Sequence, residues 1–289
     1  MSKENICKWA EISRVRHDTQ YDFLSKKLND MGFHNQVDYF DFPTSEFDER
    51  IEEIKQNYEQ IRIGSPYGEI LGNTLAQSTL IPFSLQSCDA LMKEDGKWWP
   101  RSFLEVSFVE TMIHRFGSLK IDETAIIIGC GTTARAVFSA LMKLGYVKFM
   151  FAEYFEEKAT QTLKSLRERY FNLDIRYISQ DELAYLPGIC SIIVNTTPHI
   201  EDNLLLKDLY YFNYLSKNSV VVDTNSKPLN PPLTQQALDL DLHVCDGVTV
   251  NAYNDVVWVK TCFGIDLDPE SYIEEWREHL KALHKSSES

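Results

Sequence analysis

The chain has 289 residues, with 29 Lys and Arg against 43 Asp and Glu, and a formal net charge of −14. This acidity disfavours nucleic acid as a partner, because phosphate backbones are bound through concentrated Lys and Arg. The chain contains no run of about 18 apolar residues, which is the pattern that predicts a membrane span. Six cysteines without CxxC spacing favour reduced thiols over a disulfide framework or a metal site. The N-terminal residues lack the apolar core of a signal peptide, so we expect a cytoplasmic protein that does not bind a membrane.

Helical and strand patterns alternate in the first third of the chain. Apolar spacing predicts a helix over 19–32, a strand over 36–42 and a second helix over 45–58. A further strand that begins at residue 60 runs into a Gly/Pro loop. This β-α-β-α rhythm predicts a sheet covered by helices.

A helical stretch over 102–117 leads into a region with stronger alternation. Short Val/Ile-rich strands separated by helices are typical of a doubly wound sheet. The strands are predicted over 124–129, 148–153, 174–179, 191–197, 219–225 and 242–247. The helices are predicted over 132–144, 156–170, 232–239 and 268–284, with shorter ones near 181–186 and 204–211.

The predicted fold class is therefore α/β, with an N-terminal α/β domain and a Rossmann-like doubly wound domain. We place the first domain over 1–105 and the second over 106–247. The C-terminal helices over 248–285 are expected to complete the first domain.

The stretch Gly129-Cys130-Gly131-Thr132-Thr133-Ala134 fits the G-x-G-x-x-G/A pattern between a predicted strand and a predicted helix. The first Gly permits a tight turn, the second lets the backbone approach a pyrophosphate, and the helix N-terminus attracts the phosphates. The alternative is a glycine turn that serves packing alone. The candidate cofactor-binding residues here are Gly129, Gly131, Thr132, Thr133, Ala134 and Arg135.

Two further strand ends carry candidate cofactor residues. Glu153 ends the next predicted strand, where a carboxylate accepts from the ribose hydroxyls of NAD and repels the 2′-phosphate of NADP. The alternative is a solvated surface carboxylate. Asn195, Thr196 and Thr197 close a later strand, at the edge where ligands bind in open α/β sheets. With Tyr154, these residues are predicted to line a cofactor crevice.

The order of these motifs resembles the shikimate dehydrogenase family. The resemblance is carried by GCGTTARA (129–136), EYFEEKA (153–159), VNTTP (194–198), VVVDTNSKPLNPPLTQQAL (220–238) and DGVTVNAYNDV (246–256). It implies a substrate-binding α/β domain followed by a Rossmann domain, NAD(P)-dependent hydride transfer, and a cofactor-binding role for Gly247. It covers most of the chain from about 120 to 265.

The chain departs from the family pattern at its functional positions. The segment that usually holds an Arg for the NADP phosphate reads Glu153-Tyr154-Phe155, which favours NAD over NADP. On our alignment the family's catalytic Lys falls on Gly68 and its partner Asp on Leu104, neither of which can hold a proton donor. The resemblance also places the family's paired serines at Ser13 and Val15.

Other residues near these positions are candidates for substrate contacts. Arg62 or Arg101 could clamp a carboxylate bidentately, and Tyr67 or His17 could donate a proton to a substrate. The alternative is that each Arg is a surface residue paired with an acid. The remaining candidates are Ser13, Arg14, Arg16 and Ser65, together with Asn254 at the place of the family's closing Gln. The other histidines, His199 among them, are expected to be structural or exposed.

The leading hypothesis is an NAD(P)-dependent oxidoreductase that acts on a small carbonyl, alcohol or imine substrate other than shikimate. The alternative is a catalytically inactive sensor or assembly protein that binds a dinucleotide or another ligand on the same fold. The expected partner is a small molecule, and the sequence leaves a homodimer open. Cys130 lies near a helix N-terminus, where a thiol pKa tends to fall, but we interpret it as a space-filling residue.

Overall fold

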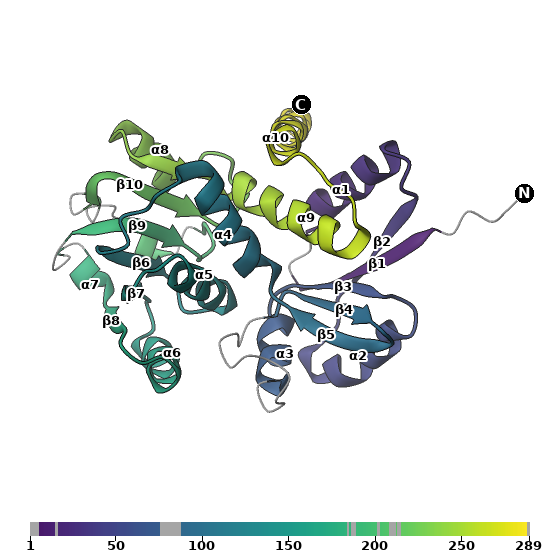
Figure 1. The fold of residues 1–289 in the computed structure, drawn as a ribbon, viewed down its shortest axis with the longest axis horizontal. Helices are drawn as coiled ribbons and strands as arrows, with labels where there is room; N and C mark the ends of the chain where they lie inside the picture. Colours follow the sequence, from purple (N-terminus) through teal and green to yellow (C-terminus); the bar gives the residue numbers. More distant parts are fainter. Residues whose placement is uncertain are drawn as a thin grey trace, which may run out of the picture. The chain divides into compact units, whose positions relative to one another are not determined.

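The computed structural model describes residues 6–14, 17–75, 88–183, 185, 189–200, 203–207, 212 and 215–287. The chain divides into two compact units, and Figure 1 labels their helices and strands. Unit 1 comprises Met1–Phe103 and Trp258–Asp266, and unit 2 comprises Leu104–Val257 and Leu267–Ser289.

Unit 1 contains a five-stranded mixed sheet in the order β2-β1-β3-β4-β5. Strands β2, β1 and β3 are parallel, whereas β4 is antiparallel to both β3 and β5. The strands are β1 Cys7–Ile12, β2 Asn35–Phe40, β3 Gln60–Ile63, β4 Ala90–Glu94 and β5 Lys97–Arg101. The helices are α1 Asp18–Asp30, η1 Thr44–Glu46, α2 Phe47–Lys55 and α3 Tyr67–Leu75.

The two faces of this sheet bury different side chains because successive strand residues point to opposite sides. Ala10 and Ile12 of β1 join a hydrophobic cluster with the α2 residues Phe47 and Ile51. On the other face, the Trp9 ring lies 5.4 Å from Tyr21 of α1 and 4.7 Å from Trp258. The parallel part of the sheet is therefore held between apolar layers.

Unit 2 contains a six-stranded parallel sheet in the order β11-β10-β9-β6-β7-β8. The strands are β6 Thr124–Ile128, β7 Lys148–Ala152, β8 Asp174–Ile178, β9 Cys190–Asn195, β10 Leu215–Asp223 and β11 His243–Cys245. The helices are α4 Phe103–Phe116, α5 Thr132–Lys143, α6 Glu156–Arg169, α7 Gln180–Leu183, η2 Leu204–Leu206, α8 Pro232–Asp239, α9 Gly247–Phe263 and α10 Pro269–Ser287.

Helices cover both faces of this sheet (Figure 1), as a doubly wound fold requires. Alternate β6 residues show the division: Ile127 packs with Phe108 of α4 and Val137 of α5, whereas Ile126 packs with Leu233 of α8. Because both faces are covered, the central strands β6, β7 and β9 are buried at nearly every position. The predicted α/β class and Rossmann-like sheet are confirmed.

Several predicted boundaries differ from the structure. Strand β1 and the β4–β5 hairpin were not predicted, and α3 begins at Tyr67, where a loop was expected. Helix α7 and η2 fall in the stretches predicted as short helices, but residues 184, 186 and 208–211 lie outside the described part of the chain. Val15 and Arg16 also lie outside the described residues.

The two compact units differ from the predicted domains in the C-terminal helices. Only residues 258–266 of the expected 248–285 segment group with unit 1, and residues 267–289 group with unit 2. The division falls inside α9, between Val257 and Trp258.

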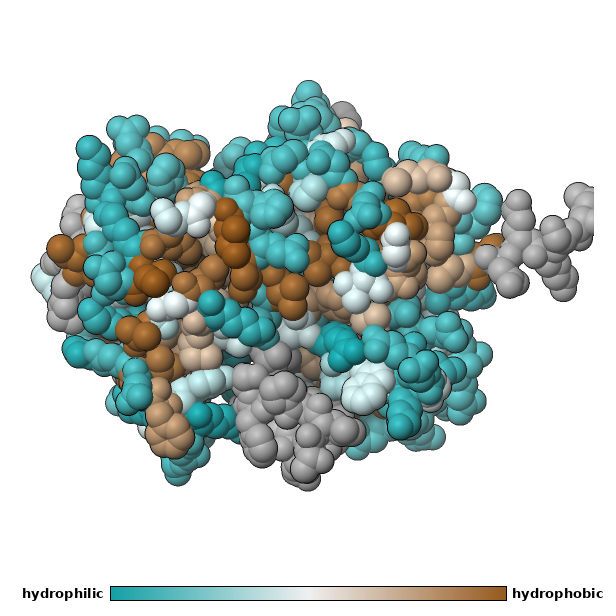
Figure 2. Space-filling model, in the orientation of Figure 1, coloured by the Kyte–Doolittle hydropathy of each residue, from teal (hydrophilic) through white to brown (hydrophobic). Residues whose placement is uncertain are grey.

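The face shown in Figure 2 carries hydrophobic residues beside hydrophilic ones. Hydrophobic residues lie at the surface over α4 in Figure 2, and the exposed side chains of this helix include Val106 and Ile113. Within the described residues, no helix is long and apolar enough to cross a membrane. Over the same residues, no group of three His, Cys, Asp or Glu side chains is arranged to hold a metal ion.

Tyr67 is a core residue of unit 1, contrary to its predicted substrate contact. Its side chain is fully buried, and its ring stacks on Phe47 at 5.3 Å. Its hydroxyl donates to the carbonyl oxygen of Phe42 and accepts from the Phe42 amide at 3.3 Å. These bonds fasten the chain after β2 to the start of α3 and account for the tyrosine without a ligand.

Replacing Tyr67 with Phe should lower the free energy of unfolding by about 1–3 kcal/mol, since it leaves buried backbone groups of Phe42 unpaired. The control is Tyr39→Phe, which removes an exposed hydrogen bond from the hydroxyl to Asp22 at 2.7 Å and should have a smaller effect. Urea denaturation measures both. Equal stability of Tyr67→Phe and the unmodified protein would contradict this structural role.

Candidate functional site

The glycine turn lies where the carboxyl ends of β6 and β9 meet. Gly129 has φ = 106°, a conformation that glycine adopts without strain. A Cβ at this position would lie 2.6 Å from Thr196 Oγ1 and 2.8 Å from Thr197 Cγ2. The missing side chain therefore allows the predicted turn to pack directly against the predicted Asn195–Thr197 loop.

Gly131 differs from Gly129 because the space beside it is open. A Cβ there would meet no described atom within 4 Å, and Gly131 is the N-cap of α5. No side chain caps this helix end. The amides of Thr132, Thr133 and Ala134 thus begin the helix beside open space, an arrangement suited to an anion.

Cys130 fills space under this turn. Its side chain is buried, and burial is the main cause that raises the thiol pKa to about 12, with the charge of Glu153 as a second cause. The tendency of a helix N-terminus to lower a thiol pKa is outweighed here. Cys130 is protonated at neutral pH, which agrees with a space-filling role and opposes a nucleophilic one.

Glu153 directly follows β7 and is 5% exposed. One carboxylate oxygen accepts from the Tyr154 amide at 3.0 Å, and the other lies 3.1 Å from Lys158 Nζ. Tyr154 and Phe155 are exposed, with their rings 5.0 Å apart and nearly perpendicular. The predicted carboxylate is therefore at the strand end, together with a cation and two apolar rings.

Asn195 is used to build its own loop. Its side-chain oxygen accepts from the amide and the hydroxyl of Thr197 at 3.0 and 2.7 Å, and its nitrogen donates to the Thr197 carbonyl at 3.0 Å. The Thr196 hydroxyl donates to the Ile128 carbonyl at 2.6 Å. These bonds fix the loop against the glycine turn, so the loop has a definite shape before any ligand binds.

Asp223, at the end of β10, is a polar centre that the sequence reasoning missed. Its buried carboxylate accepts from the amide and side chain of Asn225 at 2.9 and 2.8 Å, and from Asn195 at 3.3 Å. His199 Nε2 is also bonded to it. His199, which was expected to be structural or exposed, is thus paired with an acid at the end of a neighbouring strand.

Gly247 and Asn254 belong to α9, whose first residue packs on the loop after β10. A Cβ on Gly247 would lie 1.9 Å from the Asn225 carbonyl oxygen. Asn254 is half-buried one turn beyond Asn251, which donates to the Gly247 carbonyl at 2.7 Å. The structure therefore brings the predicted cofactor residues of unit 2 to one edge of one sheet.

In unit 1, Ser13 and Ser65 follow the adjacent parallel strands β1 and β3. A Cβ on Gly64 would lie 2.2 Å from Ser13 Oγ, so the glycine makes room for the serine. The Arg14 amide donates to the carbonyl of the exposed Ser65 at 3.1 Å. These two predicted substrate residues share one edge of the sheet.

Arg62 and Arg101 already have protein contacts. Arg62 is 3% exposed, with its guanidinium 5.1 Å from the Tyr21 ring and 4.8 Å from the Trp258 ring. Arg101 Nη2 lies 3.1 Å from both carboxylate oxygens of Glu94. Arg101 forms a surface ion pair, which fits the alternative weighed from the sequence, whereas Arg62 is a core residue, which that alternative did not foresee.

Packing accounts for Gly68 and Leu104, the residues at the two positions aligned with the family's dyad. A Cβ on Gly68 would lie 2.5 Å from the backbone oxygen of Cys88. Leu104 packs against the hydrophobic core of unit 2. Neither position accepts a long polar side chain without local rearrangement.

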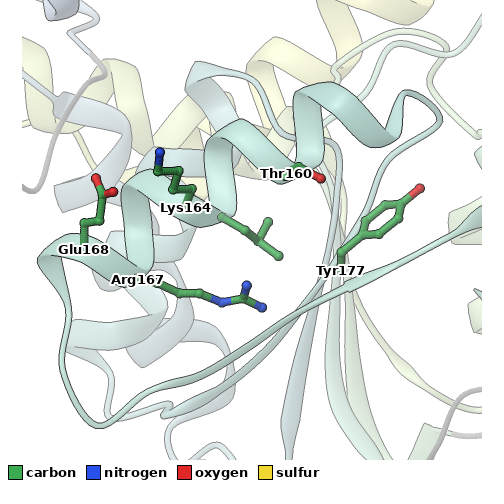
Figure 3. A pocket seen from close by; sticks show the side chains of 6 residues that line it. Thr160, Lys164, Arg167, Glu168 and Tyr177 are labelled. Atoms are coloured by element: carbon green, nitrogen blue, oxygen red, sulfur yellow. The ribbon is translucent and has the colours of Figure 1, made fainter.

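A surface hollow of about 450 Å³ lies elsewhere in unit 2, between α6 and the edge strand β8 (Figure 3). It is lined by Thr160, Leu163, Lys164, Arg167, Glu168 and Tyr177. Arg167 donates to the Ile175 carbonyl, and Tyr177 donates to the Glu153 carbonyl. No predicted cofactor residue lines this hollow.

No family model matches the chain. A curated relative is the shikimate dehydrogenase (NADP(+)) of Bartonella tribocorum, 27% identical over 146 residues, which are 50% of this chain and 49% of that protein. The chain thus matches about half the length of this relative.

Solved structures are similar over nearly the whole chain. The shikimate 5-dehydrogenase of Thermus thermophilus in complex with shikimate has a TM-score of 0.74 and 17% identity, covering 96% of this chain and 100% of that one. The quinate dehydrogenase of Corynebacterium glutamicum in complex with NAD has a TM-score of 0.77 and 15% identity, covering 94% and 99%. The chain has the shikimate dehydrogenase fold.

This is the fold that the motifs indicated, and proteins of more than one activity share it. The 5-ketofructose reductase of Gluconobacter sp. strain CHM43 has a TM-score of 0.73 and 14% identity, covering 95% of this chain and 99% of that one. Identities at this level show a shared fold and leave the substrate to be argued from residues.

A pair of glycine variants separates packing from ligand access. Gly129→Ala should lower the melting temperature, because it adds strain at positive φ and a contact with Thr196. Gly131→Ala should leave the melting temperature nearly unchanged but weaken NADH binding, because its methyl group occupies the open side of the turn. Thermal denaturation and NADH fluorescence measure the two effects. Unweakened NADH binding by Gly131→Ala would contradict the phosphate site.

Reinstating a lysine at Gly68 should destabilise unit 1 by about 1–3 kcal/mol, because its Cβ meets the Cys88 carbonyl. It should not produce shikimate oxidation. Denaturation and an NAD(P)⁺ reduction assay with shikimate check both expectations, with Gln56→Lys as the control for an added lysine at an exposed position of unit 1. A stable Gly68→Lys variant that oxidises shikimate would contradict this account.

Proposed function

We propose that the chain is an NAD(P)-dependent oxidoreductase that acts on a small carbonyl, alcohol or imine substrate other than shikimate. The observation that carries the proposal is the open glycine turn at the N-terminus of α5, with the carboxylate of Glu153 on the next strand. Backbone amides and the helix dipole bind a diphosphate, and the carboxylate accepts from ribose hydroxyls. When bound, the dinucleotide supplies or accepts the hydride.

NAD is the proposed cofactor in preference to NADP. The Glu153 carboxylate is almost buried, so a 2′-phosphate beside it meets a like charge with little screening. Lys158 already pairs with this carboxylate. The named relatives include both a NADP(+) enzyme and a complex with NAD, so the choice rests on this residue.

We propose that shikimate is not the substrate, because of the residues at two aligned positions, Gly68 in unit 1 and Leu104 in unit 2. Gly68 and Leu104 occupy the positions aligned with the family's acid/base dyad, and both are fixed by packing. Quinate and 5-ketofructose are named for proteins of the same fold, which shows that this architecture supports different substrates. A small hydroxy or oxo compound remains the proposed class.

A second candidate function is a non-catalytic dinucleotide sensor. Gly68 and Leu104 favour it, because neither can act as an acid or a base. It predicts NADH binding without turnover. The oxidoreductase predicts turnover of at least one small oxo acid, ketose or alcohol by the purified protein.

The test of the proposed function is titration with NADH and with NADPH, followed by fluorescence and by calorimetry. Saturable NADH binding tighter than about 1 mM is expected, corresponding to roughly −4 kcal/mol. Absence of binding by both dinucleotides would end the proposal.

Replacing Glu153 with Arg should shift the NADPH-to-NADH affinity ratio by about tenfold or more toward NADPH, because a charge-assisted hydrogen bond replaces a repulsion. Glu157→Arg, in the exposed first turn of α6, adds the same charge nearby and is the control. Calorimetry with each dinucleotide gives the ratios. An unchanged ratio in Glu153→Arg would show that Glu153 does not select the cofactor.

A further inference from the structure

A buried carboxylate and a half-exposed imidazole form a pair at the end of β1. Glu11 is 1% exposed, and its Oε1 lies 2.5 Å from Nδ1 of His17. The two carboxylate oxygens also accept from the His17 amide at 3.3 and 3.2 Å. The His17 side chain is 41% exposed. The ring is therefore fixed through Nδ1, and Nε2 is the nitrogen left for a second partner.

The burial of Glu11 is costly unless its charge is compensated. Its register partner on β3 is Arg62, whose buried guanidinium lies among aromatic rings. A neutral side chain would fill the same space at lower cost. The carboxylate is thus well suited to stabilise an imidazolium, which a neutral amide does not do.

The pair also lies at the sheet edge where a ligand is expected. His17 immediately precedes α1, and Ser13 and Ser65 follow the neighbouring parallel strands β1 and β3. Ligands in α/β sheets bind outside the carboxyl ends of such strands. The imidazole and two serines thus share the polar edge of unit 1.

We propose that His17 is the proton donor and acceptor for the substrate oxygen or nitrogen, and that Glu11 is its positioning residue. This deepens the proposed function and rests on it. The pair has the arrangement in which a carboxylate on Nδ1 orients an imidazole so that Nε2 exchanges the proton. In this proposal the His17–Glu11 pair takes the role of the family's Lys/Asp dyad, whose positions are occupied by Gly68 and Leu104 in this chain.

The step balances in the direction of carbonyl reduction. A hydride from the reduced dinucleotide forms the new C–H bond at the carbonyl carbon. The His17 Nε2–H bond breaks and the new O–H bond forms, so the carbonyl is reduced and the dinucleotide oxidised. The resulting neutral imidazole regains its proton from water.

The variants are chosen to keep the fold. His17→Asn retains a residue suited to a helix N-cap and removes the imidazole. Glu11→Gln retains an acceptor for the His17 amide but removes the charge. His34→Asn is the matched control, because it removes an exposed imidazole before β2, at the amino edge of the same sheet.

Kinetics are measured with a fixed panel of probes: quinate and shikimate with NAD⁺ and NADP⁺, and 5-ketofructose, pyruvate and oxaloacetate with NADH and NADPH. For any probe that turns over, His17→Asn should lower kcat by about 10²-fold or more, the usual contribution of a general acid or base. Glu11→Gln should also lower kcat, with KM little changed in both variants. His34→Asn should match the unmodified protein.

A spectroscopic signature tests Glu11 independently of turnover. In ¹⁵N-histidine-labelled protein at alkaline pH, where imidazoles are neutral, the His17 proton should lie on Nδ1, bonded to the carboxylate. The His17→Asn spectrum assigns the signal. In Glu11→Gln the amide donates to Nδ1, so the proton should move to Nε2.

Each outcome is decisive. Protonated Nδ1 together with the kcat losses supports the proposal. An Nε2–H tautomer in the unmodified protein, unchanged kcat in His17→Asn, or NADH binding without turnover of any probe overturns it. Failure to bind either dinucleotide instead rejects the proposed function itself, which the parallel NADH and NADPH titrations reveal.

Discussion

The close approach of β6 and β9 at Gly129 is the constraint on which the candidate cofactor site depends. Only a residue without Cβ fits between the strand end and Thr196, and its φ of 106° turns the chain into α5. The turn leaves the α5 N-terminus beside open space at Gly131. A packing requirement therefore shapes the candidate anion site, because the same bend leaves the backbone amides at the start of α5 beside open space.

Hydrogen bonds around Asn195 and Asp223 extend this constraint across three strand ends. Asn195 shapes its own loop and reaches Asp223, and Asp223 in turn holds His199 and Asn225. Such a network of satisfied buried groups fixes one geometry. The cofactor half thus has a shape determined by the protein alone, which agrees with a site that binds a large ligand with little rearrangement.

In unit 1, glycines also make room for groups from neighbouring elements. Gly64 admits the Ser13 hydroxyl, and Gly68 admits the Cys88 carbonyl. The second contact removes the position that the family resemblance assigns to a lysine. The Glu11–His17 pair lies at the carboxyl end of β1 and the start of α1, and it is the pair to which we assign the acid/base role by proposal.

The sequence predicted the doubly wound sheet well because its strands are buried on both faces and read as continuous apolar runs. The glycine turn and Glu153 were found because their chemistry is local in sequence. The β4–β5 hairpin was missed although Asp95-Gly96, both at positive φ, is a strong turn signal. Strand β1 was missed because charged Lys8 and Glu11 interrupt it.

Side-chain pairs between strands were harder to predict. His199 and Asp223 are 24 residues apart and meet only through the β9–β10 pairing. The buried state of Arg62 and Tyr67 also depends on packing partners from other elements, so both were interpreted as available to a substrate. The described contacts correct those two interpretations.

The most direct test of the central claim is a crystal structure of the chain grown with NADH. The account predicts density for the diphosphate against the amides of Thr132, Thr133 and Ala134, with the adenosine ribose hydroxyls on Glu153. Density for NADH elsewhere, with the space beside Gly131 closed by protein side chains, would contradict it.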